Sequence, residues 1–270
     1  MTLFVSLLRA SFAASTALLL VACSSLVQLP PSSAAPSAAR VTLADAERGY
    51  ARVLQTHVNA QGEVDFAALR DDAGDSGIGA LQNYVAAINA TPLDAAPSAD
   101  ARLAHMINAY NALSMYNVIA SNIPQSHHGW AKVKFFVLRK FDIGGTVMSL
   151  YTFENDIIRK LGDPRVHFAL NCSAVSCPVL PRVPFTAANL NGELDRETRQ
   201  FFSRPQNLRI DAATRTVYFN QILKFYSEDF TPAHAPNLIA YAQKYVQQAI
   251  ATDYAVAFTP YDWTIANSRR

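Results

Sequence analysis

The segment "ADARLAHMINAYNALSMYNVIASN", residues 99–122, decides the fold of this chain. It contains no glycine or proline, and apolar residues occur on almost every side of the helix that its pattern predicts. A helix that is apolar all round is normally buried among other elements. We therefore expect residues 99–122 to form the buried central helix of a globular domain.

Amphipathic segments before and after this helix predict the other elements. Residues 42–58 begin with Thr42 as a cap and place Ala46, Tyr50 and Leu54 on one face. Further helices are predicted at residues 78–90, 149–164, 186–204 and 235–250, and extended segments at residues 132–145, 165–170, 214–220 and 254–267. Because helices outnumber strands without regular alternation, we expect an α+β fold, a helix-rich single domain with a small antiparallel sheet.

The first 23 residues indicate export. An apolar run over residues 11–22 is too short to span a bilayer and has the proportions of a secretory signal. Residues 20–23, Leu-Val-Ala-Cys, resemble the bacterial lipobox, which implies cleavage before Cys23 and lipidation of that cysteine. The expected organisation is a signal peptide at 1–22, a lipidated Pro/Ser/Ala tether at 23–39 and a globular domain at 40–270.

This organisation predicts a lipoprotein that is attached to the membrane through Cys23. Ser24 follows the cysteine, and by resemblance to enterobacterial lipoprotein sorting a residue other than Asp there implies the outer membrane, facing the periplasm. Half of the chain is hydrophobic and 16% is charged, which fits a compact globule and excludes disorder. The net charge is +2 without any basic run, so we expect no nucleic-acid partner.

Two asparagines mark one face of the central helix. Asn108 and Asn111 are three residues apart and therefore lie side by side. A buried amide needs several hydrogen-bond partners, because each missing one costs about 1–3 kcal/mol. The two amides indicate either a structural network that holds a neighbouring loop or the wall of an active site.

Four short motifs resemble the family known as domain of unknown function 547. They are "NAYNAL" (108–113), "SLYTFEN" (149–155), "RVHFALNCSAVSCP" (165–178) and "YDWTIAN" (261–267), which occur in the order of that family. The resemblance covers roughly residues 60–265. It implies no settled activity, although the fusion of eukaryotic relatives to glutaredoxin-like domains hints at thiol chemistry.

The segment "RVHFALNCSAVSCPVL", residues 165–180, brings three reactive side chains within eleven positions. Cys177 is a candidate nucleophile, since Ser-Cys-Pro could open a helical turn whose N–H groups lower the pKa of the thiol. His167, which is expected on a strand, could act as the base. Its other ring nitrogen would be oriented by Asn108, Asn111 or Glu154.

Three other interpretations of these cysteines remain open. An exported chain meets an oxidising compartment, so Cys172 and Cys177 could form a fixed disulfide. The same pair could cycle between thiol and disulfide in redox work, although its spacing is not Cys-x-x-Cys. A zinc site of His167, Cys172 and Cys177 lacks a second close pair of ligands and would need Glu154, so we expect no metal.

We therefore expect an envelope lipoprotein that acts as a thiol-dependent hydrolase or acyl/amide transferase on an envelope peptide or protein. The expected catalytic residues are Cys177, His167, Glu154, Asn111 and Asn108, and the expected supporting or substrate-binding residues are Asn171, Cys172, Ser176 and Tyr110. No phosphate-binding loop or dinucleotide fingerprint occurs, and we expect no cofactor. The alternatives are a binding or scaffold lipoprotein with a structural Cys172–Cys177 disulfide and a thiol–disulfide redox protein.

Overall fold

The computed structural model describes residues 25–28 and 41–269. The signal peptide expected at residues 1–22 and the lipidation expected at Cys23 lie outside these residues, as does most of the expected tether. Among the described residues, no helix has both the length and the apolar character that a membrane crossing requires.

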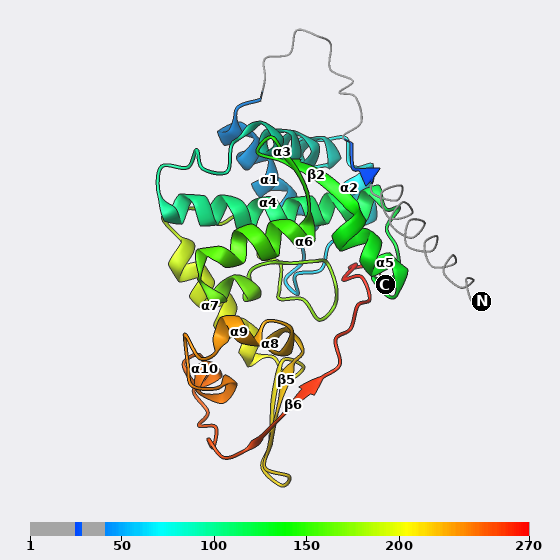
Figure 1. Cartoon of the computed structure of the whole chain (residues 1–270). Coiled ribbons are helices and arrows are strands. Elements are labelled where there is room, and N and C mark those ends of the chain that lie inside the picture. Colours follow the sequence, from blue (N-terminus) through cyan, green and yellow to red (C-terminus); the bar gives the residue numbers. More distant parts are fainter. Residues whose placement is uncertain (1–24, 29–40, 270) are drawn as a thin grey trace, which may run out of the picture.

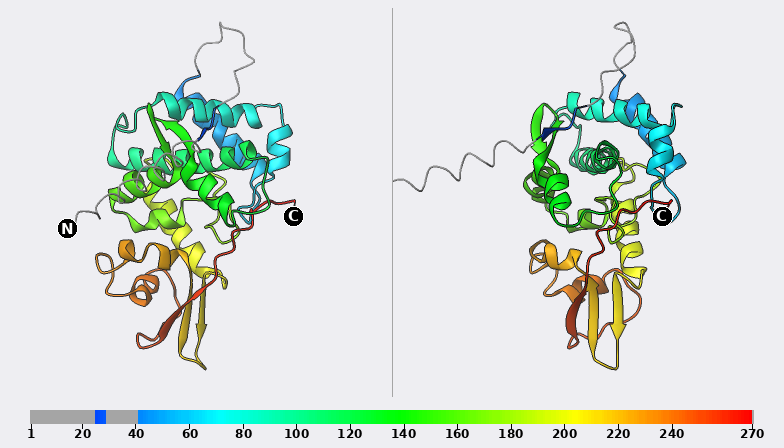
Figure 2. Two further views of the ribbon diagram at one scale, coloured as in Figure 1. Left: turned by 45° about the vertical axis from the view of Figure 1, so that its right-hand side comes forward. Right: turned by 90° about the vertical axis from the view of Figure 1, so that its right-hand side faces the viewer.

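The central helix is confirmed. α4 (Ala99–Ala120) begins after the cap Ser98 and is buried almost continuously from Leu103 to Val118. The right view of Figure 2 shows α4 end-on, with other elements around it. These elements include α1 (Leu43–His57), α2 (Phe66–Asp71), α3 (Ile78–Ala90) and the continuous helical segment of α6 (Leu150–Thr152), the π-helix η3 (Phe153–Ile158) and the 3₁₀-helix η4 (Arg159–Leu161).

The expected cap and buried face of α1 are present in the structure. The hydroxyl of Thr42 accepts the N–H of Asp45, and Ala46, Tyr50 and Leu54 are buried. The ring of Tyr50 stacks on Tyr84 of α3 with 4.7 Å between centroids. This packing joins α1 and α3 into one layer that covers α4.

The described strands form two small sheets, so the expected helix-rich α+β class is confirmed. In one sheet, β2 (Arg139–Ile143) pairs antiparallel with β3 (Thr146–Ser149) and parallel with β1 (Ser25–Leu26). In the other, β5 (Thr216–Asn220) pairs antiparallel with β4 (Leu208–Asp211) and parallel with β6 (Ala255–Thr259). The antiparallel pairs are hairpins, whereas the parallel neighbours come from distant parts of the chain, which local sequence patterns do not reveal.

β1 lies in the segment that we expected to be a tether. Its residues pair with Arg139 and Lys140, and the N–H of Val27 donates to the carbonyl of Lys140 at 2.8 Å. Residues 25–28 are therefore part of the folded domain, at the edge of the first sheet (Figure 1).

Two segments that we predicted as extended are helical over part of their length. In residues 132–145, α5 (Trp130–Val133) and the π-helix η2 (Lys134–Leu138) precede β2, because the carbonyl of Phe135 is held by the amide of Asn117 at 3.1 Å. Residues 165–170 are also not a strand. The 3₁₀-helix η5 (Pro164–Phe168) replaces it, with Pro164 at its first position and the carboxylate of Asp163 as its cap.

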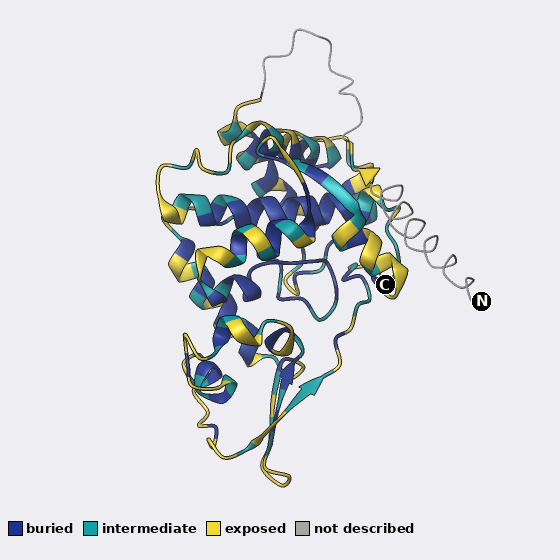
Figure 3. Cartoon of the chain, viewed as in Figure 1, coloured by how far each residue is buried: buried dark blue, intermediate teal, exposed yellow. Residues whose placement is uncertain are grey.

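The C-terminal half forms a second hydrophobic cluster below α4, seen in the lower part of Figure 1. Its helices are α7 (Leu190–Ser203), α8 (Ile222–Phe225), α9 (Ser227–Phe230) and α10 (Leu238–Gln243), the last much shorter than the helix expected at 235–250. Residues 261–267 then run back along the loop that contains both cysteines, with a bridge between Ala174 and Ile265. Figure 3 shows that this loop, beneath α4, is mostly buried. The junction of the two clusters is where the candidate site lies.

Candidate functional site

A cavity of about 520 Å³ lies at the junction of the two hydrophobic clusters. Its lining includes Cys177, Cys172, His167, Glu154, Tyr110 and Arg159. Five of these six were expected at the site from the sequence. The structure therefore gathers both sulfurs, the imidazole and the glutamate around one space.

The sulfur of Cys177 is surrounded by hydrogen-bond donors. The backbone N–H of Cys172 and the hydroxyl of Tyr261 each donate to it, both at 3.1 Å. The side chain of Asn171 fixes the loop in this shape, because its oxygen accepts the N–H of Ser173 and its nitrogen donates to the carbonyl of Pro178, both at 2.7 Å. Ser173 itself has a left-handed backbone, with φ of 64°.

These donors decide the protonation of the two thiols. Burial raises the pKa of Cys177, but hydrogen bonds from the Cys172 thiol, the Tyr261 hydroxyl and the backbone N–H groups of Ala174 and Cys172 outweigh it, so this pKa lies below its usual range. The hydrogen bond to Cys177, together with burial, raises the pKa of Cys172 well above its usual range. Of the two thiols, Cys177 is therefore the one that loses its proton first.

Two details differ from the expectation for this loop. Both cysteines are free, so the structure does not contain the alternative of a fixed disulfide. No helical turn begins at Cys177, since residues 178–181 have no regular structure and the N–H of Cys177 donates to the carbonyl of Ala174. The N–H groups that lower the pKa of the thiol come instead from the preceding loop.

His167 is oriented by a carboxylate that the sequence analysis did not select. Its Nε2 lies 2.7 Å from Oδ2 of Asp229 in α9, and its ring stacks on Tyr226 with 4.0 Å between centroids. Arg159 binds the same carboxylate through Nε at 2.7 Å and Nη2 at 2.8 Å. Burial raises the pKa of Asp229, but the hydrogen bonds from His167 and Arg159 hold it well below its usual range. Asp229 is therefore ionised and fixes the ring of His167.

Glu154 lies on another wall of the cavity, in η3. The hydroxyl of Tyr110 donates to its Oε2 at 2.8 Å, and Tyr226 also forms a hydrogen bond with it. Burial, followed by the charge of Glu154, raises the pKa of both tyrosines far above the usual range. Both hydroxyls therefore stay protonated and act as donors beside the carboxylate.

The two asparagines of α4 hold backbone rather than the histidine. Asn108 donates to the carbonyl of Phe185 at 2.7 Å and accepts its N–H at 3.0 Å. Asn111 donates to the carbonyl of Ala169 at 3.0 Å and accepts the N–H of Asn171 at 2.8 Å. Their amides thus form the structural network that was one of the two expectations. They do not orient His167, and neither side chain is among those that line the cavity.

Ser176 has a comparable supporting role, since its hydroxyl accepts the N–H of Asp262 at 2.8 Å. His127 is buried, and its Nε2 lies 3.0 Å from the carbonyl of Cys172. Burial lowers the pKa of His127 to about 4. Its ring is therefore neutral at pH 7 and donates to the cysteine loop.

The site residues missed by sequence reasoning come from beyond the cysteine loop. Asp229 stands in the segment "SEDF" (227–230), and Tyr261 is the first residue of the motif "YDWTIAN". An acid next to buried aromatic residues was the available signal for Asp229. Among the described residues, no group of three or more His, Cys, Asp or Glu side chains is arranged to hold a metal ion.

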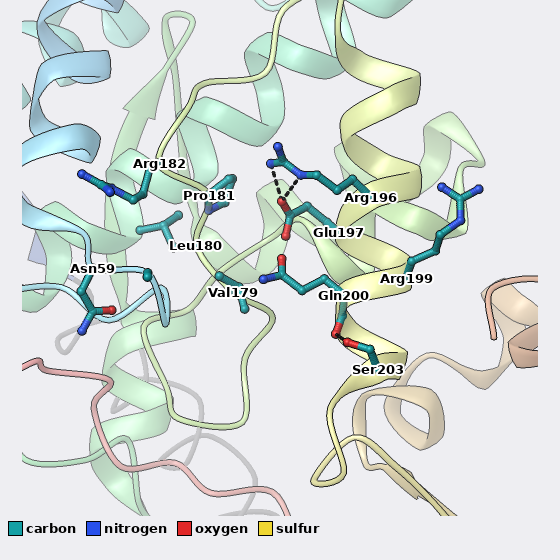
Figure 4. A pocket seen from close by; sticks show the side chains of 11 residues that line it. Asn59, Val179, Leu180, Pro181, Arg182, Arg196, Glu197, Arg199, Gln200 and Ser203 are labelled. Carbon is teal, nitrogen blue, oxygen red and sulfur yellow. Dashed lines mark hydrogen bonds and ion pairs between the residues drawn. The ribbon is translucent and has the colours of Figure 1, made fainter. Parts of the chain in front are cut away.

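A second cavity of about 550 Å³ lies between α7 and residues 179–182 (Figure 4). Arg182, Arg196 and Arg199 line it, but Arg196 is paired with Glu193 and Glu197, and Arg182 donates to the carbonyl of Gln55. Its lining contains neither a histidine nor a cysteine. The cavity of Cys177 is therefore the better candidate for chemistry.

Fold and site together define an α+β protein in which two hydrogen-bonded cysteines line a cavity. Residues 95–202 match the model of a family described as "Protein of unknown function, DUF547". This match supports the resemblance of the first three motifs and includes α4, Glu154, His167 and both cysteines. The fourth motif, which begins at Tyr261, and Asp229 lie beyond it. Comparisons with curated proteins and with solved structures found no match.

Proposed function

We propose that this protein is a thiol-dependent hydrolase or acyl/amide transferase with Cys177 as its nucleophile. The observation that carries the proposal is the environment of the sulfur, which faces a cavity and receives hydrogen bonds from Cys172 and Tyr261. A thiolate is the reactive form of cysteine, and these donors stabilise it at neutral pH.

In the proposed reaction, the thiolate of Cys177 adds to the carbonyl carbon of an ester or amide, and the C=O electron pair moves onto oxygen. The hydroxyl of Tyr261 can then turn its hydrogen bond from the sulfur to this oxyanion. Collapse expels the alcohol or amine, which takes a proton. Water, or an amine in a transferase, then attacks the thioester and releases the thiol of Cys177.

His167 is the proposed proton carrier for the leaving group and the attacking water. Its Nε2 is bound to Asp229, so Nδ1 is the nitrogen left to exchange a proton. The carboxylate stabilises the imidazolium that forms during the reaction, as the third member does in other nucleophile–histidine sites. Glu154 with its two tyrosine donors supplies a polar wall that can bind the substrate.

Incubation with p-nitrophenyl acetate tests this proposal. We expect a burst of p-nitrophenolate and a single acetyl group on the peptide that contains Cys177, sensitive to hydroxylamine. C177S should lose both signals, whereas C172S should keep them, because a hydroxyl can still donate to the sulfur. An acetyl group that persists in C177S, or no adduct in the native protein, would rule out the nucleophile.

A second candidate function is thiol–disulfide exchange. It is favoured by the asymmetry of the pair, in which Cys177 has the lowered pKa and Cys172 the raised one. Cys177 would attack a substrate disulfide and release one thiol, and Cys172 would then displace the second thiol and form a Cys172–Cys177 disulfide. With oxidised glutathione, this function requires C172S to trap glutathione on Cys177, and the native protein to become bridged.

We also propose that the domain works at the bacterial envelope as a lipoprotein anchored through Cys23, on the periplasmic side of the outer membrane. The support is the sequence of residues 20–23. Substrates within reach would be envelope peptides, proteins or lipids. Metabolic labelling with a fatty-acid analogue should mark the protein, and C23A should abolish the label and keep the precursor uncleaved.

A further inference from the structure

The cavity of Cys177 reaches the surface beside a group of exposed apolar side chains. We name this surface the α5–η2 face, and it consists of Trp130, Lys132, Val133, Lys134, Val137 and Tyr151. Trp130 is 65% exposed and Tyr151 is 54% exposed. Val133, Val137 and Tyr151 also line the cavity, so the face and the mouth of the cavity are continuous.

The spacing of the apolar residues in α5 and η2 places them on the same side of the helical segment. Positions 130, 133 and 137 follow one side of the helical segment formed by α5 and η2. Single exposed apolar residues are ordinary, but a group of them at the mouth of a cavity marks an interaction surface. Tryptophan and tyrosine, with an apolar body and one polar atom, are suited to the boundary between water and lipid.

The charge of the face favours an anionic surface. The charged residues of the face are Lys132 and Lys134, and no acidic residue occurs between Asp100 and Asp142 in the sequence. Lys132 lies with its ammonium 3.7 Å from the ring centroid of Trp263, at the edge of the cavity. Lysines beside exposed apolar side chains can place their charge at headgroup level while the apolar groups enter the lipid.

The position of β1 brings the expected anchor to the same place. Ser25 pairs with Arg139 in parallel, so β1 begins beside the end of η2, which precedes Arg139. Cys23 stands two positions before Ser25 in the sequence, so their Cα atoms are at most about 7 Å apart. Figure 1 shows β1 and α5 on the same side of the molecule.

We propose that the α5–η2 face rests on an anionic bilayer and that the cavity of Cys177 takes the acyl chain of an amphiphilic ester or amide from that bilayer. This inference rests on the proposed function, whose substrate class it names. The apolar part of the cavity, with Val133, Phe136, Val137 and Phe225, would hold the chain. Cys177 would form a bond to the acyl carbon, the alcohol or amine would leave with a proton, and water would release the fatty acid.

Binding to vesicles tests the face directly. The chain from Ser24 onward, which contains every described residue, is mixed with vesicles of phosphatidylcholine alone or of equal parts phosphatidylcholine and phosphatidylglycerol, and sedimented. We expect K134Q to weaken binding to the anionic vesicles by about fivefold, and W130S to weaken binding to both kinds. Neither residue is among those that line the cavity.

The controls are K160Q, which changes an exposed lysine on η4, and V256S, which changes an exposed apolar residue on β6. They should bind vesicles as the unsubstituted protein does. Absence of binding by the unsubstituted protein, or equal losses in the control variants, would overturn the inference, and the acetylation of Cys177 by p-nitrophenyl acetate would still report on the proposed function.

Hydrolysis of p-nitrophenyl laurate embedded in the anionic vesicles tests the substrate class. We expect W130S and K134Q to hydrolyse this ester severalfold more slowly and to react with soluble p-nitrophenyl acetate at an unchanged rate. Equal hydrolysis of the vesicle-bound ester by native protein and W130S would contradict delivery from the bilayer. Loss of acetylation in the native protein, with vesicle binding intact, would instead contradict the proposed nucleophile.

Discussion

The hydroxyl of Tyr261 lies 3.1 Å from the sulfur of Cys177 and 3.7 Å from the sulfur of Cys172. It joins the C-terminal segment of the described chain to the cysteine loop and gives the site a donor that is 84 residues away from Cys177. Burial raises the pKa of Tyr261 well above its usual range, so this hydroxyl remains a donor at every pH at which the fold is expected to be stable.

Substitution of this tyrosine should make the thiol less reactive. Y261F removes one donor from the thiolate, and a hydrogen bond to a charged group contributes about 1.5–3 kcal/mol. We expect iodoacetamide to alkylate Cys177 about tenfold more slowly at pH 7, with the rate profile displaced to higher pH. Y245F, in which a partly buried tyrosine outside the cavity is changed, is the control. An unchanged pH profile in Y261F would show that this hydroxyl does not hold the thiolate.

Substitutions of Cys172 test its role as a hydrogen-bond donor to Cys177. C172A removes the thiol that donates to Cys177, so we expect the alkylation profile of Cys177 to move to higher pH. C172S retains a donor and should keep a profile close to that of the native protein. If C172S behaves like C172A, the hydrogen bond from position 172 does not determine the reactivity of Cys177.

His127 should make the stability of the domain depend on pH. Its pKa is lowered to about 4 in the folded protein, from 6.5 in the unfolded chain, so the unfolded state binds more protons between these values. The stabilisation is therefore complete above pH 6.5 and is lost as the pH falls toward 4. We expect the free energy of unfolding in urea to fall by about 2 kcal/mol between pH 7 and pH 5 from this group alone.

H127Q is the matched variant for that measurement, because glutamine can donate to the carbonyl of Cys172 but does not titrate. The difference in free energy of unfolding between the native protein and H127Q should shrink or change sign on acidification. A constant difference from pH 7 to pH 5 would mean that protonation of His127 does not lower the free energy of unfolding.

Asn111 should matter for stability rather than for the protonation of His167. N111A leaves the carbonyl of Ala169 and the N–H of Asn171 buried without this partner. We expect the free energy of unfolding to fall by about 2–4 kcal/mol, whereas Q206A, at an exposed position, should change it by less than about 0.5 kcal/mol. If N111A kept its full stability but showed a displaced pH profile of acetylation, Asn111 would act in the proposed reaction and not in stabilising the fold.

The sequence predicted those parts of the fold that depend on local patterns. The apolar run of α4 and the cap at Thr42 are local signals, and each corresponds to an observed helix or helix start. The aromatic run of residues 134–138 resembled a strand, but its backbone is held in a helical turn by Asn117 of α4. A contact between two distant segments overrides a local propensity, and a single sequence does not reveal it.

The same distinction applies to the site. Cys177, His167 and Glu154 were selected because reactive residue types stood in short motifs, and the structure brings all three to one cavity. The partner of His167 was sought in Asn108, Asn111 or Glu154, whereas Asp229 lies 62 residues after His167. The position of Asp229 depends on how α9 packs on η5. The local sequence pattern of neither segment predicts this packing.

The distance along the chain between Cys177 and Tyr261 also sets the order in which the site matures. When residue 177 leaves the ribosome, the phenol that will stabilise its negative charge has not yet been synthesised. Until that later segment settles beside the loop, the sulfur lacks one of its donors and resembles an ordinary thiol more closely. The full acidity of this thiol is therefore acquired late in folding, when residues 261–267 reach the cysteine loop.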